Sequence, residues 1–407
     1  MTLDMTSGSP TKKILRFALP LMFSMLLQQL YTFCDSLIVG RFLGSVALTA
    51  TGAAGNLNWF PQNLLACAIN GFAVALSQRF GAKDREGFRS FFAGTLILGV
   101  GLGLVICTLG TFFPETALAF LDTPSELLKQ AATYLRVLWL GFGITALMNA
   151  FSAALLSMGD SRTPLVSLAV SSVVNIVLDI LILAFTPLGV AGAALATVLA
   201  QLCAALWSLR VLLKNGDYFP EKRHFRLRWN VAKELLRLGV PQMLSSAVIN
   251  SGDLLVQSII NGCGVIFVMG MTAARRYFSM LNVVGYGLEV ALVTYVGQNW
   301  GAGNLGRIKM GTRAATAMGL VTSLLTGLAA CLAAEPLIVF LLPDAPREAI
   351  QIGVRSFRIL GGFLFGLYLL CEFRAAIQGM GNVKLPMLAG FSELVCRVCA
   401  ALALPGL

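Results

Sequence analysis

The chain has 407 residues, of which 57% are hydrophobic and 12% are charged, and its formal net charge is +11. Soluble domains carry about twice that charged fraction, so the composition excludes an ordinary soluble protein and indicates a membrane-embedded one. The positive charge would also suit a nucleic-acid partner, but its placement in alternate loops, described below, argues against nucleic acid.

Long apolar segments follow one another along the chain. Each is long enough to cross a bilayer as a helix, which takes about 20 residues. Helices are the only plausible spanning form for such long segments, because backbone polar groups must be paired in lipid. The predicted fold class is therefore an all-α integral membrane protein. The eleven predicted spans are residues 14–40, 46–77, 91–113, 132–157, 164–186, 188–213, 235–260, 265–297, 310–334, 351–377 and 385–404.

Basic residues concentrate in alternate loops. Lys12, Lys13 and Arg16 precede the first span, and the longest loop, residues 214–234, is strongly basic. The loops between are poor in basic residues, which is the positive-inside pattern. We therefore expect a multi-pass protein of the cell inner (plasma) membrane with a cytoplasmic N-terminus and no cleaved signal peptide. The basic loop is then either a solvated connector or a segment attracted to anionic lipid.

The first span carries a polar face. Gln28, Thr32 and Asp35 are spaced by 4 and 3 residues, which places them on one side of a helix. An ionisable side chain at this depth is costly and usually faces an interior cavity, so we favour a functional Asp35 over a structural one. Pro20 begins the span and either permits a functional bend or forms a rigid kink.

Two later spans carry further oxygen ligands. Ser171, Asn175 and Asp179 recur at spacings of 4 in the fifth span, and Thr197 and Gln201 lie on one face of the sixth. Such an all-oxygen set suits a shared proton or a hard cation such as Na⁺. The spacing alone does not show that the three helices meet.

The second half has polar residues of its own. Glu393 and Arg397 stand at i and i+4, which predicts an internal ion pair. For the other buried charges, structural pairing and a role toward substrate or ion are equally plausible. The candidates are Asn250 and Asp253 in the seventh span, Glu289 in the eighth and Glu372 in the tenth.

The remaining motifs exclude other classes of protein. The only histidine, His224, lies in the basic loop, and Cys396 and Cys399 form a lone CxxC, so the sequence predicts no metal centre other than a possible Na⁺ site. No GxxxxGK[ST] motif occurs, which disfavours an ATP-driven pump. The sequence likewise lacks the clustered histidines and acidic metal motifs of intramembrane enzymes. We expect no enzymatic activity and no cofactor beyond a coupling ion, H⁺ or Na⁺.

The sequence contains an internal repeat that covers most of the chain. MGDSRTP at 158–164 recurs as MGNVKLP at 380–386, and ILRFALP at 14–20 as LLRLGVP at 235–241. Equivalent positions are six spans apart, so the halves should run parallel, with a cavity between two lobes. The predicted divisions are an N-lobe at 1–213, a cytoplasmic linker at 214–234 and a C-lobe at 235–407. The counterpart of the sixth span would fall near residue 410, so we expect 6 + 5 spans.

In these motifs the chain resembles the multidrug and toxic compound extrusion (MATE) family. The supporting residues are Pro20, Asp35 and Val39-Gly40, the pair QRFGA (78–82) and QNWGAG (298–303), the doubled MGDSRTP and MGNVKLP, Asn175 with Asp179, and the segment 189–197. The resemblance extends from residue 14 to about 404. It implies two pseudo-symmetric lobes of six helices each, alternating access, and export of cationic amphiphilic compounds in exchange for H⁺ or Na⁺.

The resemblance also assigns roles to residues. It implies ion coupling at Asp35, Asn175, Asp179 and Thr197, and helix bending at Pro20. Some relatives use acids of the second lobe, which keeps Asp253 and Glu372 as candidates. We expect a monomer whose partners are small cationic substrates and membrane lipids. A flippase for lipids or lipid-linked saccharides, which would need a cationic cavity, stays open as the alternative.

Overall fold

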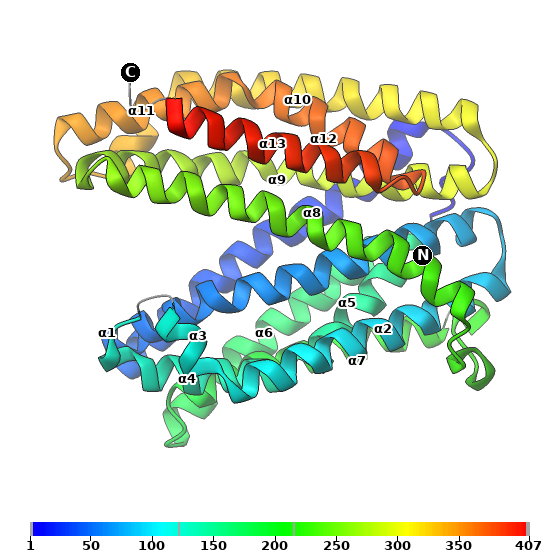
Figure 1. Ribbon diagram of the computed structural model, residues 1–407, viewed down its shortest axis with the longest axis horizontal. Helices are drawn as coiled ribbons and strands as arrows, with labels where there is room; N and C mark the ends of the chain where they lie inside the picture. Colours follow the sequence, from blue (N-terminus) through cyan, green and yellow to red (C-terminus); the bar gives the residue numbers. More distant parts are fainter. Residues whose placement is uncertain (1–2, 121–122, 215, 404–407) are drawn as a thin grey trace. The chain divides into compact units, whose positions relative to one another are not determined.

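The computed structural model describes residues 3–120, 123–214 and 216–403, and within them every long element is a helix. The end of the last predicted span at residue 404 and the end of the C-lobe at 407 lie outside the described residues. Figure 1 shows the helices in chain order. They are α1 (Pro10–Gly81), α2 (Arg85–Phe112), α3 (Pro114–Phe120), α4 (Ser125–Leu140), α5 (Phe142–Ser157), α6 (Arg162–Phe185), α7 (Val190–Lys214), α8 (Trp229–Gly262), α9 (Val265–Gly301), α10 (Leu305–Leu341), α11 (Arg347–Gly362), α12 (Leu364–Gly379) and α13 (Lys384–Ala403).

These helices explain the predicted spans. By length and hydropathy, seven described helices can cross a membrane, and two bent pairs, α4 with α5 and α11 with α12, raise the number to nine. The 72-residue α1 covers the first two predicted spans, because Gly44 breaks it with φ 85° and ψ 178°, a conformation that favours glycine. The last predicted span falls on α13, which is helical but is not among the described helices that are long and apolar enough to count as a span. The all-helical membrane fold is confirmed.

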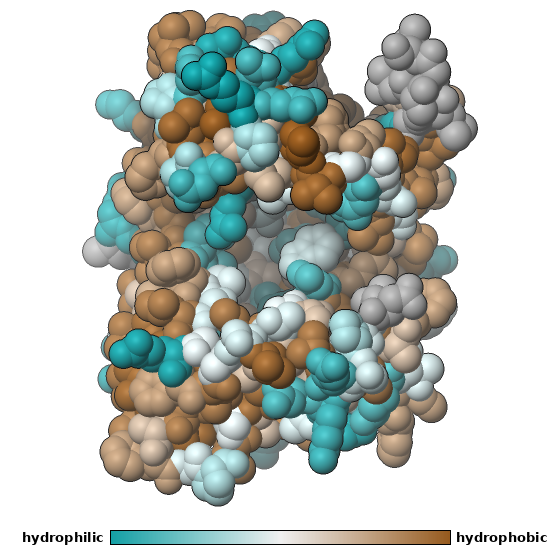
Figure 2. Space-filling view, turned by 90° about the vertical axis from the view of Figure 1, so that its left-hand side faces the viewer, coloured by the Kyte–Doolittle hydropathy of each residue, from teal (hydrophilic) through white to brown (hydrophobic). Residues whose placement is uncertain are grey.

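The surface is that of a protein in lipid. Large apolar side chains such as Phe112, Leu332 and Val265 are more than two-thirds exposed, at 71%, 73% and 76%. Figure 2 shows hydrophobic residues over much of the face in view. Contiguous apolar surface of this extent is unusual for a monomer in water and typical of a bilayer-facing one.

The chain divides into two compact units. Unit 1 comprises Met1–Asp4 and Phe23–Met243, and unit 2 comprises Met5–Met22 and Leu244–Leu407. In unit 1, α6 packs on α7 and α2 packs on α5; in unit 2, α9, α10 and α11 pack on one another and α12 packs on α9 and α10. The first and eighth helices each contribute to both units, since α1 changes unit after Met22 and α8 after Met243.

The internal repeat is visible in the backbone. The pair α4 and α5 bends by 49°, and its counterpart, α11 and α12, bends by 43°. Each doubled MG motif then forms the same turn, with Gly159 at φ 81° and Gly381 at φ 83°. The following residue caps the next helix: Asp160 accepts the backbone N–H of Thr163 at 3.0 Å, and Asn382 accepts that of Leu385 at 3.4 Å. The motif therefore persists because it ends one helix and starts another.

Candidate ion and substrate site

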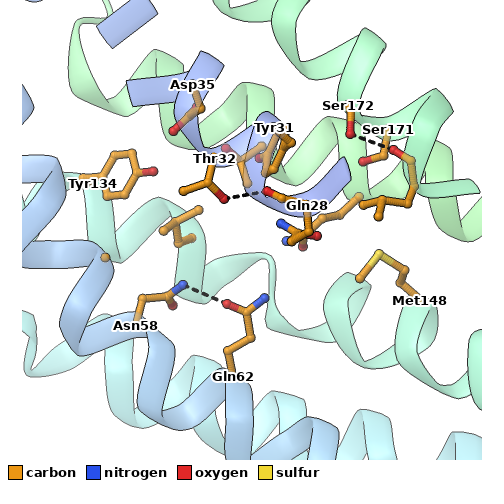
Figure 3. Close-up of a pocket in the computed structure, with 15 residues that line it drawn as sticks. Gln28, Tyr31, Thr32, Asp35, Asn58, Gln62, Tyr134, Met148, Ser171 and Ser172 are labelled. Carbon is orange, nitrogen blue, oxygen red and sulfur yellow. Dashed lines mark hydrogen bonds between the residues drawn. The ribbon is translucent and has the colours of Figure 1, made fainter. Parts of the chain in front are cut away.

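A polar cavity of about 230 Å³ lies within unit 1. Both parts of α1 and helices α4 to α7 line it, and Figure 3 shows their polar side chains converging on it. None of the described residues that line it is basic. The lining residues are Gln28, Tyr31, Thr32, Asp35, Gly55, Asn58, Gln62, Tyr134, Leu138, Met148, Leu168, Ser171, Ser172, Thr197 and Gln201.

Two carboxyl groups meet beside this cavity. Asp35 of α1 lines it, and Asp179 of α6 is fully buried behind it and close enough to interact directly with Asp35. Within the described chain, both oxygens of Asp179 and Oδ1 of Asp35 have no hydrogen-bond partner. Burying ionised carboxylates without donors is costly, so this pair requires a proton or a cation for balance.

Asn175 and Thr197 lie next to the two acids. The Asn175 amide donates to the Thr197 hydroxyl at 3.5 Å, and that hydroxyl donates to the Ala193 carbonyl at 3.2 Å. The Oδ1 atom of the fully buried Asn175 has no partner among the described residues. The structure therefore brings together all four residues on which ion coupling was expected, from α1, α6 and α7, and leaves three kinds of oxygen acceptor there.

Two tyrosines complete the site and were missed in the sequence. Tyr31 and Tyr134 lie beside the Thr197 side chain, with Asp35 and Asp179 near by. Tyr31 stands one helical turn before Asp35, so the spacing that grouped Gln28 with Asp35 would also have found it. Tyr134 has no such signal, because only the packing of α4 against α7 brings it into the site.

The second part of α1 adds an amide pair to the opposite wall. Asn58 and Gln62 stand at i and i+4, and the Asn58 amide donates to Gln62 at 3.4 Å. The indole of Trp139 in turn donates to the Asn58 oxygen at 3.0 Å. Amides inside an apolar span were the signal that could have identified this wall.

Pro20 lies inside α1 in unit 2 and does not break it. Gly44 is the residue of α1 with non-helical φ and ψ, so the helix continues through Pro20 in this conformation. A role for Pro20 in bending remains a prediction.

The acids of unit 2 have internal cations. Arg397 donates to Asp253 and, at 2.6 Å, to Glu393, and Arg374 donates to Glu393 at 3.3 Å. The ion pair between Glu393 and Arg397 thus forms as its spacing suggested. Arg275 binds Gln257 at 2.9 Å rather than an acid.

The other candidates of unit 2 lie near this network. Glu289 is half-buried beside Cys371 and the Arg374 charge, and Glu372, 1% exposed, lies close to Glu289. The Oε2 atom of Glu372 has no partner in the described part of the chain. Asn250 donates to Ser246 at 3.4 Å on α8. Glu289 and Glu372 therefore approach each other, while Asp253 is engaged by Arg397.

Comparison with known proteins settles the family. The model of the MatE family matches residues 20–181 and again residues 241–402, one match in each repeat. The chain belongs to the MATE family. This is a family of multidrug efflux transporters, so the expectation that the chain is a transporter and not an enzyme is confirmed.

Individual relatives agree with this assignment. The chain is 31% identical over 305 residues to the probable multidrug resistance protein YpnP of Bacillus subtilis, covering 75% of this chain and 68% of that protein. It is 28% identical over 387 residues to the probable multidrug resistance protein NorM of Thermotoga maritima, covering 94% and 83%. A crystal structure of a MATE protein in a bent conformation matches with TM-score 0.88 at 25% identity, covering 96% of this chain and 87% of that one.

Proposed function

We propose that this MATE protein is a secondary antiporter that exports cationic amphiphilic compounds in exchange for H⁺ or Na⁺. The observation that carries the proposal is the pair of neighbouring carboxyl groups, Asp35 and Asp179, of which three oxygens have no hydrogen-bond partner among the described residues, beside a cavity with no basic residue in its described lining. The named relatives, which are multidrug resistance proteins, support the substrate class.

The size of the cavity favours an ion site. A volume of about 230 Å³ is below the roughly 300–1,000 Å³ of typical small-molecule pockets. It suits an ion with a few waters, held by Asp35, Asp179 and the amide oxygen of Asn175. Inward movement of one cation releases about 2.3 kcal/mol per 100 mV of membrane potential, which is the driving force for export.

The residues of the site suggest how coupling works. With one H⁺ or Na⁺ bound, the charge of the pair of acids falls from −2 to −1 and their cost of burial falls with it. Without it, they hold negative charge that attracts a cationic substrate. Ion and substrate therefore favour different states of the site, which is the condition for exchange. In this proposal the protein acts as a monomer in the plasma membrane, with its N-terminus in the cytoplasm.

The flippase alternative has less support. It needs a basic cavity for a phosphate or pyrophosphate. In the described chain, Arg374 and Arg397 are engaged by Glu393 and Asp253, and Arg275 by Gln257. Three arginines that could serve such a cavity are thus already engaged, whereas Arg276, next to Arg275, is exposed and shows no ion pair in the described chain.

The test uses the purified full chain in proteoliposomes. Ethidium movement is driven by an imposed pH gradient or by a Na⁺ gradient, and the gradient that drives it identifies the ion. Asp35→Asn and Asp179→Asn should each reduce driven transport at least tenfold, because an amide cannot carry the charge. Asp253→Asn is the matched control and should keep most of the activity. Full transport in both first variants would contradict the proposal.

A further inference from the structure

The first helix of each repeat begins with the same basic and apolar face. Lys12 and Arg16 in α1 correspond to Lys233 and Arg237 in α8, each 221 positions later. All four side chains are exposed. Residues four apart lie on one side of a helix, about 6 Å apart, so each pair can reach one phosphate.

Apolar side chains lie on the same helix face as each basic pair and form a stripe with it. In α1, Leu15 and Leu19 are 43% and 44% exposed. At the equivalent positions of α8, Leu236 and Val240 are both 38% exposed. The opposite side of each helix is buried, by Ile14 and Phe17 in one case and by Leu235 and Leu238 in the other. Each helix therefore presents two cations and two apolar side chains that alternate along the same face.

The basic pairs have no ion partner within the described chain, although neighbouring arginines do. In unit 1, Arg79 pairs with Glu234 at 3.3 Å and Arg89 with Glu221 at 2.5 Å. Glu234 is next to Lys233 in sequence but turns toward Arg79, so it does not neutralise the pair on α8. Exposed cations kept free of acids in both repeats are complementary to an external anion.

We propose that each of these two faces is a binding site for one anionic phospholipid. The phosphate lies between Lys12 and Arg16, or between Lys233 and Arg237, and an acyl chain lies along the two apolar residues that alternate with them on the same face. A lipid satisfies both parts of the face, since Lys and Arg bind a headgroup and their stems and neighbours cover the chain. A free phosphate would use only the cations and leave the apolar stripe uncovered.

The two sites differ in a way that predicts their relative affinity. The segment before α8 adds Arg226, Arg228 and Trp229, and Trp229 is 72% exposed. Tryptophan at a membrane–water interface anchors a helix at headgroup depth. The site on α8 should therefore hold its lipid more tightly than the site on α1, where Gly8 stands at the position equivalent to Trp229.

Native mass spectrometry of the detergent-purified full chain tests the proposal. The probes are palmitoyl-oleoyl phosphatidylglycerol and the zwitterionic phosphatidylcholine with the same chains. The wild-type protein should retain two phosphatidylglycerol molecules in preference to phosphatidylcholine. Lys12→Gln with Arg16→Gln should remove the weaker one, and Lys233→Gln with Arg237→Gln the tighter one. Each lost charge should weaken binding roughly fivefold.

Two controls distinguish lipid binding at these sites from non-specific attraction of anionic lipid to basic residues. Lys83→Gln with Lys222→Gln removes two exposed basic residues of unit 1 that lie outside the stripe, and should leave both lipids bound. Lys233→Arg with Arg237→Lys keeps the charge and should also keep binding, even if the neutral variants fold poorly. Millimolar inorganic phosphate should not displace the lipid.

Three outcomes would overturn the inference. They are equal binding of the two lipids by the wild-type protein, retention of the preference when all four residues are Gln, and an equal loss in the Lys83 and Lys222 control. The lipid count needs no ion gradient and no transport, so its failure is distinguishable from failure of the antiport proposal.

Discussion

The two units are built from the same repeat, but their polar clusters differ in whether the acidic side chains have basic partners. In unit 1, Asp35 and Asp179 have carboxyl oxygens without partners in the described chain. In unit 2, Asp253 and Glu393 share Arg397, and Arg374 adds a second cation. Asp35 and Asp179 have no cation beside them in the described chain, whereas Asp253 and Glu393 have Arg397; of the other acids in unit 2, Glu372 has an Oε2 atom that also lacks a partner there. This contrast is the reason why the proposed ion exchange is assigned to unit 1.

Aligning the two repeats shows which residues make the two polar clusters different. Asn175 and Ser171 on α6 correspond to Arg397 and Glu393 on α13, each 222 positions later. Asp179 corresponds to Ala401. Duplication has preserved the turn and cap that start both helices, while the residues about two to five turns further on have diverged. Backbone symmetry and chemical symmetry are therefore separate properties of this fold.

The largest effect on transport is expected when the arginine of the unit 2 cluster is introduced at the equivalent position of unit 1. Asn175→Arg places a tethered cation beside Asp35 and Asp179, where it should replace the exchangeable ion. Gradient-driven ethidium transport in proteoliposomes should fall to background while the thermal unfolding temperature stays near that of the wild type. Asn175→Gln, which brings length without charge, is the control and should retain measurable transport. Driven transport by the arginine variant would show that the pocket does not carry the ion.

The next effect concerns stability in unit 2. Arg397→Gln leaves Asp253 and Glu393 with one cation fewer, and should lower the free energy of unfolding by about 1–3 kcal/mol. Thermal unfolding in detergent micelles measures the loss. Adding Asp253→Asn and Glu393→Gln removes the uncompensated charges and should recover most of it. If the triple variant is no more stable than the single one, the network does not act as an ion cluster.

A smaller effect is expected where a neutral residue positions the site. Thr197→Ala removes the hydroxyl that accepts from Asn175 at 3.5 Å, so the amide should lose its orientation. The rate of driven transport should fall several-fold, mainly through a higher ion concentration for half-maximal rate. Thr197→Ser keeps the hydroxyl and should restore the wild-type ion dependence. An unchanged ion dependence in the alanine variant would remove Thr197 from the site.

Much of this architecture was accessible in the sequence, for physical reasons. Apolar length fixes where spans occur, and a spacing of 3 or 4 residues fixes which side chains share a face. That is why the helices coincide with the predicted spans and why Glu393 meets Arg397. The break at Gly44 fell between two predicted spans, although the sequence did not identify the glycine itself.

What the sequence could not supply is contact between distant helices. The meeting of Asp35 with Asp179 depends on how α1 packs against α6, and the resemblance to relatives suggested it rather than any spacing. Tyr134 entered the site through tertiary packing alone. Arg275 likewise binds the amide oxygen of Gln257 at 2.9 Å, a contact between two helices that no spacing within one helix predicts.

The smallest effect on stability is expected for an ion pair that is exposed to water. At the start of α2, Arg85 binds Asp217 of the 3₁₀ turn Gly216–Tyr218 at 2.9 Å, but their side chains are 62% and 66% exposed. Arg397 and Glu393 in unit 2 are 30% and 25% exposed. Water screens the first pair, so Arg85→Gln should cost less than about 1 kcal/mol and its effect should vanish in high salt. The loss caused by Arg397→Gln should persist in salt. Equal salt sensitivity of the two variants would mean that exposure does not set the difference, and the contrast between surface and interior charge would fail for this protein.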